Sequence, residues 1–160
     1  MTETLVREAG PLDEKAAQPW GRQAFADLRQ IYVPKPDVQM RASGEQQSFS
    51  RLVAERDGQI VGTVCWRVEG DRLHLRALAV ACDHRRRGIA RALVTRCVDL
   101  ARQSALRAVS AYTVAETGNV PIFQRLGFTL IRQELDGFAT TPSGLPVTEA
   151  YLELPIAVTE

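Results

Sequence analysis

A run of positive charge next to a glycine, "HRRRGIA" at residues 84–90, has the residue types that bind an anion. Arg85, Arg86 and Arg87 supply the charge, and Gly88 lets a ligand approach the backbone closely because it has no Cβ. If a helix begins here, its first N–H groups lack partners and its dipole adds partial positive charge. The run therefore predicts a phosphate or pyrophosphate site, and the alternative is the solvated rim of a surface helix.

A second group of reactive residue types lies just upstream, in "HLRALAV" at residues 74–80. On a regular strand, alternation would place His74 and Arg76 on one wall with Leu78 and Val80. An imidazole with an ordinary pKa of ~6.5 suits a general base near neutral pH. A neighbouring arginine would lower that pKa and keep the ring neutral. The alternative is a structural histidine held by a hydrogen bond.

Two elements must position these residues: a strand at 72–80 and a helix at 88–103. The helix is predicted from apolar residues that recur on one face, with Val94 and Ala101 beside them. Those residues are Ile89, Leu93, Cys97 and Leu100. A helix between two strands favours a parallel return, so residues 106–114 are expected to pair in parallel with the first strand.

The rest of the chain predicts one mixed domain over residues 1–160. Residues 13–32 look helical but contain Pro19 and Gly21, which predicts two short helices or one kinked helix. Residues 33–47 are rich in turn formers and predict a long loop. Asp57-Gly58 predicts a tight hairpin. The remaining expected elements are strands at 4–10, 49–56, 60–69, 128–135 and 147–156 and a short helix at 120–126.

Composition excludes several functional classes. The 160 residues are 45% hydrophobic and 24% charged with a net charge of +1, which argues against a broad basic surface for nucleic acid or membrane. The polar start "MTETLVREAG" is not expected to be a signal peptide, and no apolar run is long enough to span a membrane. Three cysteines without a CxxC pair favour a reduced, cytoplasmic protein. Cys82 and His84 are close in sequence, but no metal is expected there.

In this context the chain resembles the GNAT superfamily of acetyl-CoA-dependent N-acyltransferases. Two motifs carry the likeness, "LAVACDHRRRGIARAL" and "PIFQRLGF", in the family's order and on the elements that the family requires. The resemblance implies an α+β domain whose central, mostly antiparallel mixed sheet has six to seven strands, flanked by about four helices. It implies acetyl-CoA as co-substrate, with the Val80 N–H polarising the thioester carbonyl. The residues implied to bind the coenzyme are Leu78, Ala79, Val80, Arg85, Arg86, Arg87, Gly88, Ile89, Ala90, Arg91, Asn119 and Phe123.

The likeness is sharper to the arylalkylamine (serotonin) branch of the family, which carries "HLHALAV" and "VPFYQRFGF" where this chain has "HLRALAV" and "VPIFQRLGF". It implies that His74 is the base. The second histidine of that branch is Arg76 here, and arginine cannot relay a proton. The family's acidic tyrosine falls on Phe123, which has no proton to give, so Tyr112 or solvent would have to replace it. Asn119 and Glu116 could contact coenzyme or amine, or could simply begin the short helix.

The function predicted from the sequence is acetyl transfer to a primary amine of a small molecule by direct attack. Two alternatives stay open: a non-catalytic acyl-CoA-binding regulator, motivated by Phe123, and an acetyltransferase acting on protein lysines or N-termini. The acceptor, the acyl group and the oligomeric state are not fixed by the sequence, and a homodimer is compatible with it. Specificity is expected to depend on the last hairpin and on residues 14–47, which include Trp20, Phe25, Tyr32 and Asp37.

Overall fold

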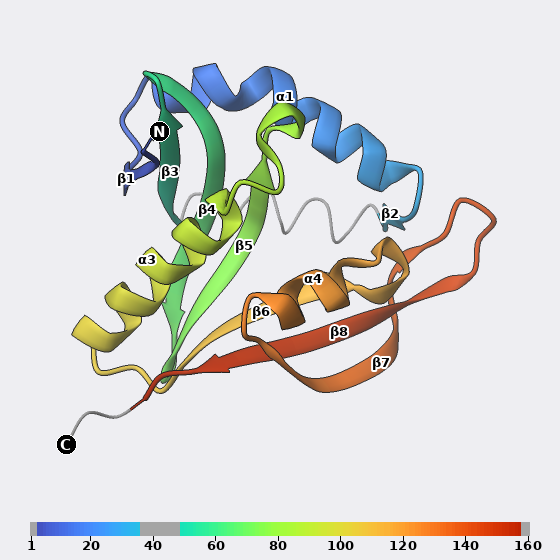
Figure 1. Ribbon diagram of the computed structural model, residues 1–160. Coiled ribbons are helices and arrows are strands. Elements are labelled where there is room, and N and C mark those ends of the chain that lie inside the picture. Colours follow the sequence, from blue (N-terminus) through green and yellow to red (C-terminus); the bar gives the residue numbers. More distant parts are fainter. Residues whose placement is uncertain (1–2, 36–48, 158–160) are drawn as a thin grey trace.

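The computed structural model describes residues 3–35 and 49–157, whose strands form one eight-stranded mixed sheet (Figure 1). The strand order is β1-β3-β4-β5-β6-β8-β7-β2, in which β5 and β6 pair in parallel and the other neighbours are antiparallel. The strands are β1 (Leu5–Glu8), β2 (Val33–Pro34), β3 (Ser50–Arg56), β4 (Gln59–Glu69), β5 (Arg72–Val80), β6 (Ala108–Val114), β7 (Thr129–Thr140) and β8 (Pro146–Pro155). The predicted α+β class, with a mostly antiparallel sheet, is confirmed.

The sheet has one strand more than the six to seven predicted. The additional strand is β2, which lies at the start of the predicted loop at 33–47 and pairs Val33 with Thr140 of β7. Two residues, one of them a proline, contain no alternation from which a strand could be predicted. The rest of that loop, including Asp37, lies outside the described residues.

Three α-helices lie within the described ranges: α1 (Asp13–Arg29), α3 (Ile89–Gln103) and α4 (Asn119–Arg125). The region predicted as two short helices or one kinked helix is a single helix that continues through Pro19 and Gly21. An interior proline costs about 3 kcal/mol, so tertiary contacts must offset it. Asp13 at the helix start is paired with Arg7 of β1 at 2.7 Å, Ala17 is buried, and the helix packs against β4.

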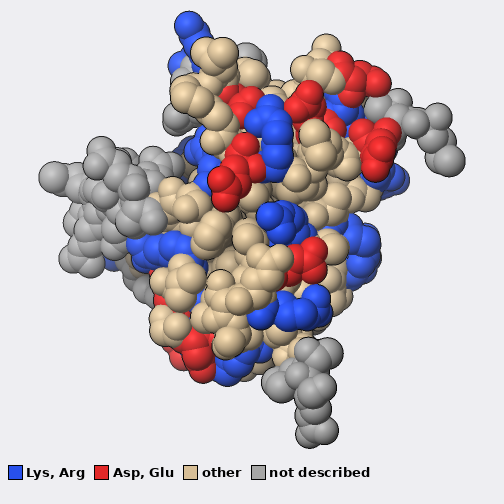
Figure 2. All heavy atoms as spheres, turned by 90° about the vertical axis from the view of Figure 1, so that its left-hand side faces the viewer, with Lys and Arg blue, Asp and Glu red and all other residues tan. Residues whose placement is uncertain are grey.

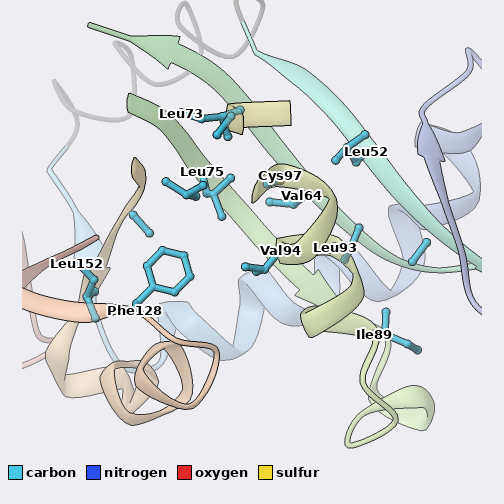
Figure 3. Close-up of a cluster of buried hydrophobic side chains, with 14 of the residues drawn as sticks. Leu52, Val64, Leu73, Leu75, Ile89, Leu93, Val94, Cys97, Phe128 and Leu152 are labelled. Atoms are coloured by element: carbon cyan, nitrogen blue, oxygen red, sulfur yellow. The ribbon is translucent and has the colours of Figure 1, made fainter. Parts of the chain in front are cut away.

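The hydrophobic core lies between the sheet and the two helices α3 and α4, which cover the same face (Figures 1 and 3). The predicted apolar stripe of α3 is confirmed, since Ile89, Leu93 and Cys97 are at most 1% exposed. These side chains meet Leu73 and Leu75 of β5, among others, as Figure 3 shows. We call this side of the sheet the helix face and the opposite side the distal face.

Charges of both signs are interspersed on the face drawn in Figure 2, in keeping with the net charge of +1. None of the helices in the described part of the chain has the length and apolar character needed to cross a membrane. Positive charge is therefore of functional interest only where it gathers locally.

Candidate active site

The site is organised by the divergence of β5 and β6. Their parallel pairing runs from Arg72–Ala108 to Leu75–Ala111, although β5 continues to Val80 and β6 to Val114. Beyond the last pair the two strands separate toward the end of the sheet near α1 (Figure 1). We call this region the strand split. Two strand edges that face each other without pairing leave backbone N–H and C=O groups available to a ligand.

One such backbone group belongs to Val80. The N–H of Ala81 donates to the Val61 carbonyl of β4 at 2.8 Å. Because successive N–H groups of a strand point to opposite edges, the Val80 N–H points away from β4 and into the strand split. The Val80 carbonyl points the same way and accepts a 3.4 Å hydrogen bond from Arg85 Nε. The predicted oxyanion donor therefore faces the split.

A β-bulge overturns the prediction that His74, Arg76, Leu78 and Val80 share one face. Cys65 pairs with Arg76 but Thr63 pairs with Ala79, so Ala77 and Leu78 together oppose one residue of β4. Ala77 adopts a φ of 55°, a left-handed conformation that costs a non-glycine residue about 1–2 kcal/mol. The bulge exchanges the two faces. Before it Leu73 and Leu75 enter the helix-face core, and after it Leu78 and Val80 pack against that core.

The consequence of the bulge is that His74 and Arg76 lie on the distal face while Leu78 and Val80 line the helix face. A base on one face and the coenzyme-side residues on the other meet only across the strand split. This arrangement lets two molecules approach the split from opposite sides of the sheet.

The arginine-rich loop has the backbone of an anion site. Arg86 and Gly88 have φ values of 62° and 78°, and Gly88 is the N-cap of α3. A Cβ built on Gly88 would meet no described atom within 4 Å, so this glycine is required by its conformation and not by crowding. The first backbone bond of α3 runs from the Ala92 N–H to the Gly88 carbonyl. The preceding N–H groups, those of Ile89, Ala90 and Arg91, thus lie in the unpaired first turn.

Four arginines at this loop have different positions. Arg85 reaches back to β5, as described, while the exposed Arg86 and Arg87 extend the local positive charge. Arg91, predicted as a coenzyme contact, donates to the Arg125 carbonyl at the end of α4 at 2.8 Å. This bond holds the start of α3 against the end of α4, on the helix face beside the strand split.

His74 is held from β6. Its Nδ1 lies 2.9 Å from the Oγ of Ser110, the residue opposite it in the parallel register, and Ser110 is 2% exposed. Burial lowers the pKa of His74 below its ordinary value of 6.5. Nearby charges also act: Glu69 raises the pKa, and Arg67, Arg72 and Arg76 lower it. The Ser110 contact was not predicted, because the register between two strands separated by a helix cannot be read from either strand alone.

Tyr112 stands beside His74 at the mouth of the strand split. It is the first residue of β6 after the last pair, and its ring meets the His74 ring edge-on at 5.3 Å between centroids. Its hydroxyl accepts a 3.3 Å hydrogen bond from Arg132 of β7, and its ring packs against Tyr151 of β8. The structure thus brings the two candidate proton-transfer groups, His74 and Tyr112, together.

The other predicted residues lie on or before α4. Glu116 accepts hydrogen bonds from the Thr148 N–H at 2.8 and 3.0 Å, so its carboxylate connects the short 3-10 turn Ala115–Thr117 to β8. Asn119 is the first residue of α4, and its N–H donates to the Thr117 hydroxyl. Phe123 is half-buried and meets Phe128 edge-on at 5.3 Å, on the helix face. Asn119 and Phe123 therefore lie on the side of the arginine-rich loop, whereas Glu116 has a structural contact.

Cys82 and His84 occupy the 3-10 turn after β5 and line a shallow hollow of about 370 Å³ together with Trp20 of α1. The Trp20 indole N–H and His84 Nδ1 are buried and have no hydrogen-bond partner among the described residues. This hollow lies on the β4 side of β5 and is separate from the strand split.

A strand split beside a glycine-containing, arginine-rich helix start defines a class of protein. A model of the acetyltransferase (GNAT) family matches residues 15–128, most of the chain. The chain therefore belongs to that family and is an acetyl-CoA-dependent acetyltransferase.

Solved structures show the same fold over nearly the full length. The ribosomal-protein-S18-alanine N-acetyltransferase of Escherichia coli superposes with a TM-score of 0.72 at 18% identity, covering 99% of this chain and 97% of its own. An N-acetyltransferase of Staphylococcus aureus gives 0.74 at 17% identity, with 97% and 99% covered. The Salmonella typhimurium protein yncA, solved with its cofactor acetyl-CoA, gives 0.66 at 18% identity, with 98% and 95% covered.

Proposed function

We propose that this protein transfers the acetyl group of acetyl-CoA to a primary amine by direct attack of the amine. The observation that carries the proposal is the strand split, which has the Val80 N–H on its β5 edge and His74 with Tyr112 on its distal face. The alternatives, a regulator that only binds acyl-CoA and an enzyme for protein amines, are outcomes of the test below.

The residues present fit acetyl-CoA. The first turn of α3 and the left-handed Arg86 and Gly88 offer unpaired N–H groups to a pyrophosphate, and the space in front of Gly88 is free of described atoms. The unpaired edge of β5 at Leu78–Val80 would hold the amide-containing arm as a strand would. When bound, acetyl-CoA supplies an activated thioester. The Val80 N–H would then act as an oxyanion donor, typically worth about 3 kcal/mol.

His74 is the group that would accept the proton of the attacking amine. If the Nδ1–H donates to Ser110, Nε2 keeps a free lone pair for the proton, directly or through water. Burial keeps the imidazole neutral at physiological pH, as a base must be. The likeness of "HLRALAV" to the arylalkylamine enzymes supports this role, but it is confined to the core motifs and names no acceptor.

A proton for the departing thiolate has two sources here. Phe123 cannot provide one, whereas Tyr112 has a hydroxyl near His74 on the distal face. A thiol of pKa ~8.5 also leaves tolerably well near neutral pH with solvent as the acid. Tyr112 is our candidate acid, and Glu116 is the candidate base if His74 is not.

Direct attack is supported by the cysteines. Cys65 and Cys97 are buried, and burial raises the pKa of the Cys97 thiol to about 12, which keeps it protonated and unreactive. Cys82 is exposed but lies on the turn that lines the hollow beside α1. An acetyl-enzyme on cysteine would therefore need Cys82, and intact-mass analysis of the Cys82→Ala variant tests that route.

The experiment is a panel of amines and one lysine-containing peptide, assayed by release of free coenzyme A. Turnover of a small amine is expected. Acetyl-CoA binding by calorimetry without turnover of any amine would identify a regulator, and turnover of the peptide alone would identify a protein acetyltransferase. Val80→Pro, which removes the N–H, should abolish turnover, whereas Ala79→Pro is no control because it disrupts pairing with β4. A suitable control is Thr95→Ala on the exposed side of α3.

A further inference from the structure

Two arginines beside the candidate base have no carboxylate partner among the residues that the structure describes. Arg76 lies on β5 and Arg132 on β7, and both belong to the distal face. Other arginines of this face are neutralised: Arg67 pairs with Glu69 at 2.7 Å, and Arg72 approaches Glu153 at 3.6 Å. Two unneutralised guanidinium groups next to one reaction centre are costly unless a ligand uses them.

Arg132 is held in place by aromatic rings. Its guanidinium carbon lies 4.4 Å from the centre of the Tyr151 ring, and its Nη2 donates to the Tyr112 hydroxyl. A guanidinium has five donors in a planar fork, and this bond uses one of them. Stacking fixes the plane, so little conformational entropy remains to be lost when an anion binds.

Arg76 occupies the other side of the strand split. It follows His74 by two residues on the same face of β5, which places the two Cα atoms about 6–7 Å apart. Its guanidinium carbon lies 5.6 Å from the centre of the Phe49 ring, which Arg67 also covers at 4.4 Å. Arg76 and Arg132 therefore flank the His74–Tyr112 pair, one on β5 and the other reaching in from β7.

Acidic residues of the same face do not cancel this charge at the split. Glu69 and Glu153 have the arginine partners already named. Glu134 and Glu149 are opposite each other on β7 and β8, one same-face position farther along than Arg132 and Tyr151. The residues nearest the base are thus a histidine, a tyrosine and two arginines, a set that repels a simple cationic amine and attracts an anion.

From this juxtaposition we infer that the acceptor is an amine that also carries a carboxylate, which Arg76 and Arg132 bind while the amine faces His74. The inference rests on the proposed acetyl transfer and adds the substrate class. Arginine matches a carboxylate because its parallel N–H groups can bond both oxygens. The same positive charge lowers the pKa of a bound ammonium and so favours the neutral amine that attacks.

Matched acceptors test the inference. Phenylalanine, leucine and methionine are compared with their carboxamides, which keep the side chain and the amine but lose the negative charge. Specificity constants are calculated on the unprotonated amine, because the carboxamides have more acidic ammonium groups. We expect the carboxylate to be preferred about tenfold or more, as charged hydrogen bonds imply. Equal or better use of the carboxamides would overturn the inference while leaving acetyl transfer intact.

Variants assign the preference to the two arginines. Arg76→Gln and Arg132→Gln should each reduce the carboxylate-to-carboxamide ratio, and the double variant should bring it near one. Arg102→Gln, at the far end of α3 where Arg102 pairs with Asp99, should leave the ratio unchanged. A ratio that survives in the double variant would contradict the assignment.

A binding measurement keeps the two proposals distinguishable. Saturation-transfer NMR with the amino acids and carboxamides, in the presence of coenzyme A, reports acceptor binding without chemistry. If no amine is acetylated but the carboxylates bind in an Arg132-dependent way, the proposed function fails and the anion site stands. If neither form binds preferentially, the inference fails whatever the activity.

Discussion

His74 depends on its neighbour for the protonation state that chemistry requires. Ser110 contacts Nδ1 from the adjacent strand, and this contact leaves Nε2 as the nitrogen able to accept a proton. Burial then keeps the ring neutral by lowering its pKa. A structural histidine would need only the first of these features, whereas a base needs both together with an aspect toward the strand split.

The pH dependence of turnover tests this role. A base must be deprotonated, so the specificity constant on the unprotonated amine should rise with pH and level off. Because burial lowers the pKa of His74, the midpoint should fall below 6.5. His74→Gln should remove the limb and roughly 10²–10⁴ of the rate, the usual span of general acid–base catalysis. Acetyl-CoA affinity by calorimetry should barely change, and an unaltered pH profile in the variant would leave His74 as a structural residue.

At the scale of elements, the glycine at the start of α3 connects sequence to coenzyme binding. Gly88→Val places a β-branched side chain at a φ of 78° and puts methyl groups in the space in front of the first turn. We expect acetyl-CoA affinity to fall at least tenfold while the fold persists, because no described atom crowds that Cβ. Calorimetry measures the affinity, and circular dichroism checks the fold. Unchanged affinity would place the pyrophosphate elsewhere.

Close packing of α3 on β4 makes a second prediction. A Cβ on Gly62 would lie 2.8 Å from the Ile89 side chain and 3.2 Å from that of Leu93, so Gly62→Ala must push α3 away from the sheet. We expect a loss of about 1–3 kcal/mol in the free energy of unfolding, the usual cost of overpacking. Gly21→Ala in α1, where a Cβ meets no described atom within 4 Å, is the matched control and should be neutral or stabilising. Urea titration of both variants decides it.

Which features the sequence could predict follows from the range of the interactions. The α3 stripe and the Asp57-Gly58 turn, where both residues have positive φ, are local patterns and were predicted. The bulge at Ala77 was missed, because "HLRALAV" alternates without any break that marks it. The contacts of Ser110 and Arg132 with the site depend on register between strands distant in the chain, which one sequence does not specify.

For the molecule as a whole, the strand split requires that β5 and β6 be held firmly at their other end. A polar network lies there. Arg107, just before β6, bonds both carboxylate oxygens of Glu153 at 3.1 Å and Asp71 at 2.7 Å. Tyr151 donates to Glu153 at 2.6 Å, and Arg72 contacts the Tyr151 hydroxyl. The network thus joins the β4–β5 turn, the start of β6 and the end of β8.

Glu153 is the centre of that network, and its charge gives the last prediction. The Arg107 hydrogen bonds lower the pKa of Glu153 below its ordinary 4.5. A carboxylate with a depressed pKa in the folded state stabilises the protein above its unfolded-state pKa, and the contribution is lost as the pH falls toward the folded-state value. Glu153→Gln should therefore lower the free energy of unfolding by about 1 kcal/mol at pH 7, a modest value because Arg107 is half exposed.

The pH dependence separates this charge effect from a loss of packing. As the pH falls below about 4.5, the parent carboxylate also becomes neutral, so the difference in melting temperature between parent and Glu153→Gln should narrow. Glu8→Gln, at the exposed end of β1, should show no difference to narrow. A gap that stays constant from pH 7 to pH 3 would mean that Glu153 acts by shape alone. The divergence of β5 and β6 would then depend on the apolar packing of Leu73 and Leu75 against α3, and not on this network.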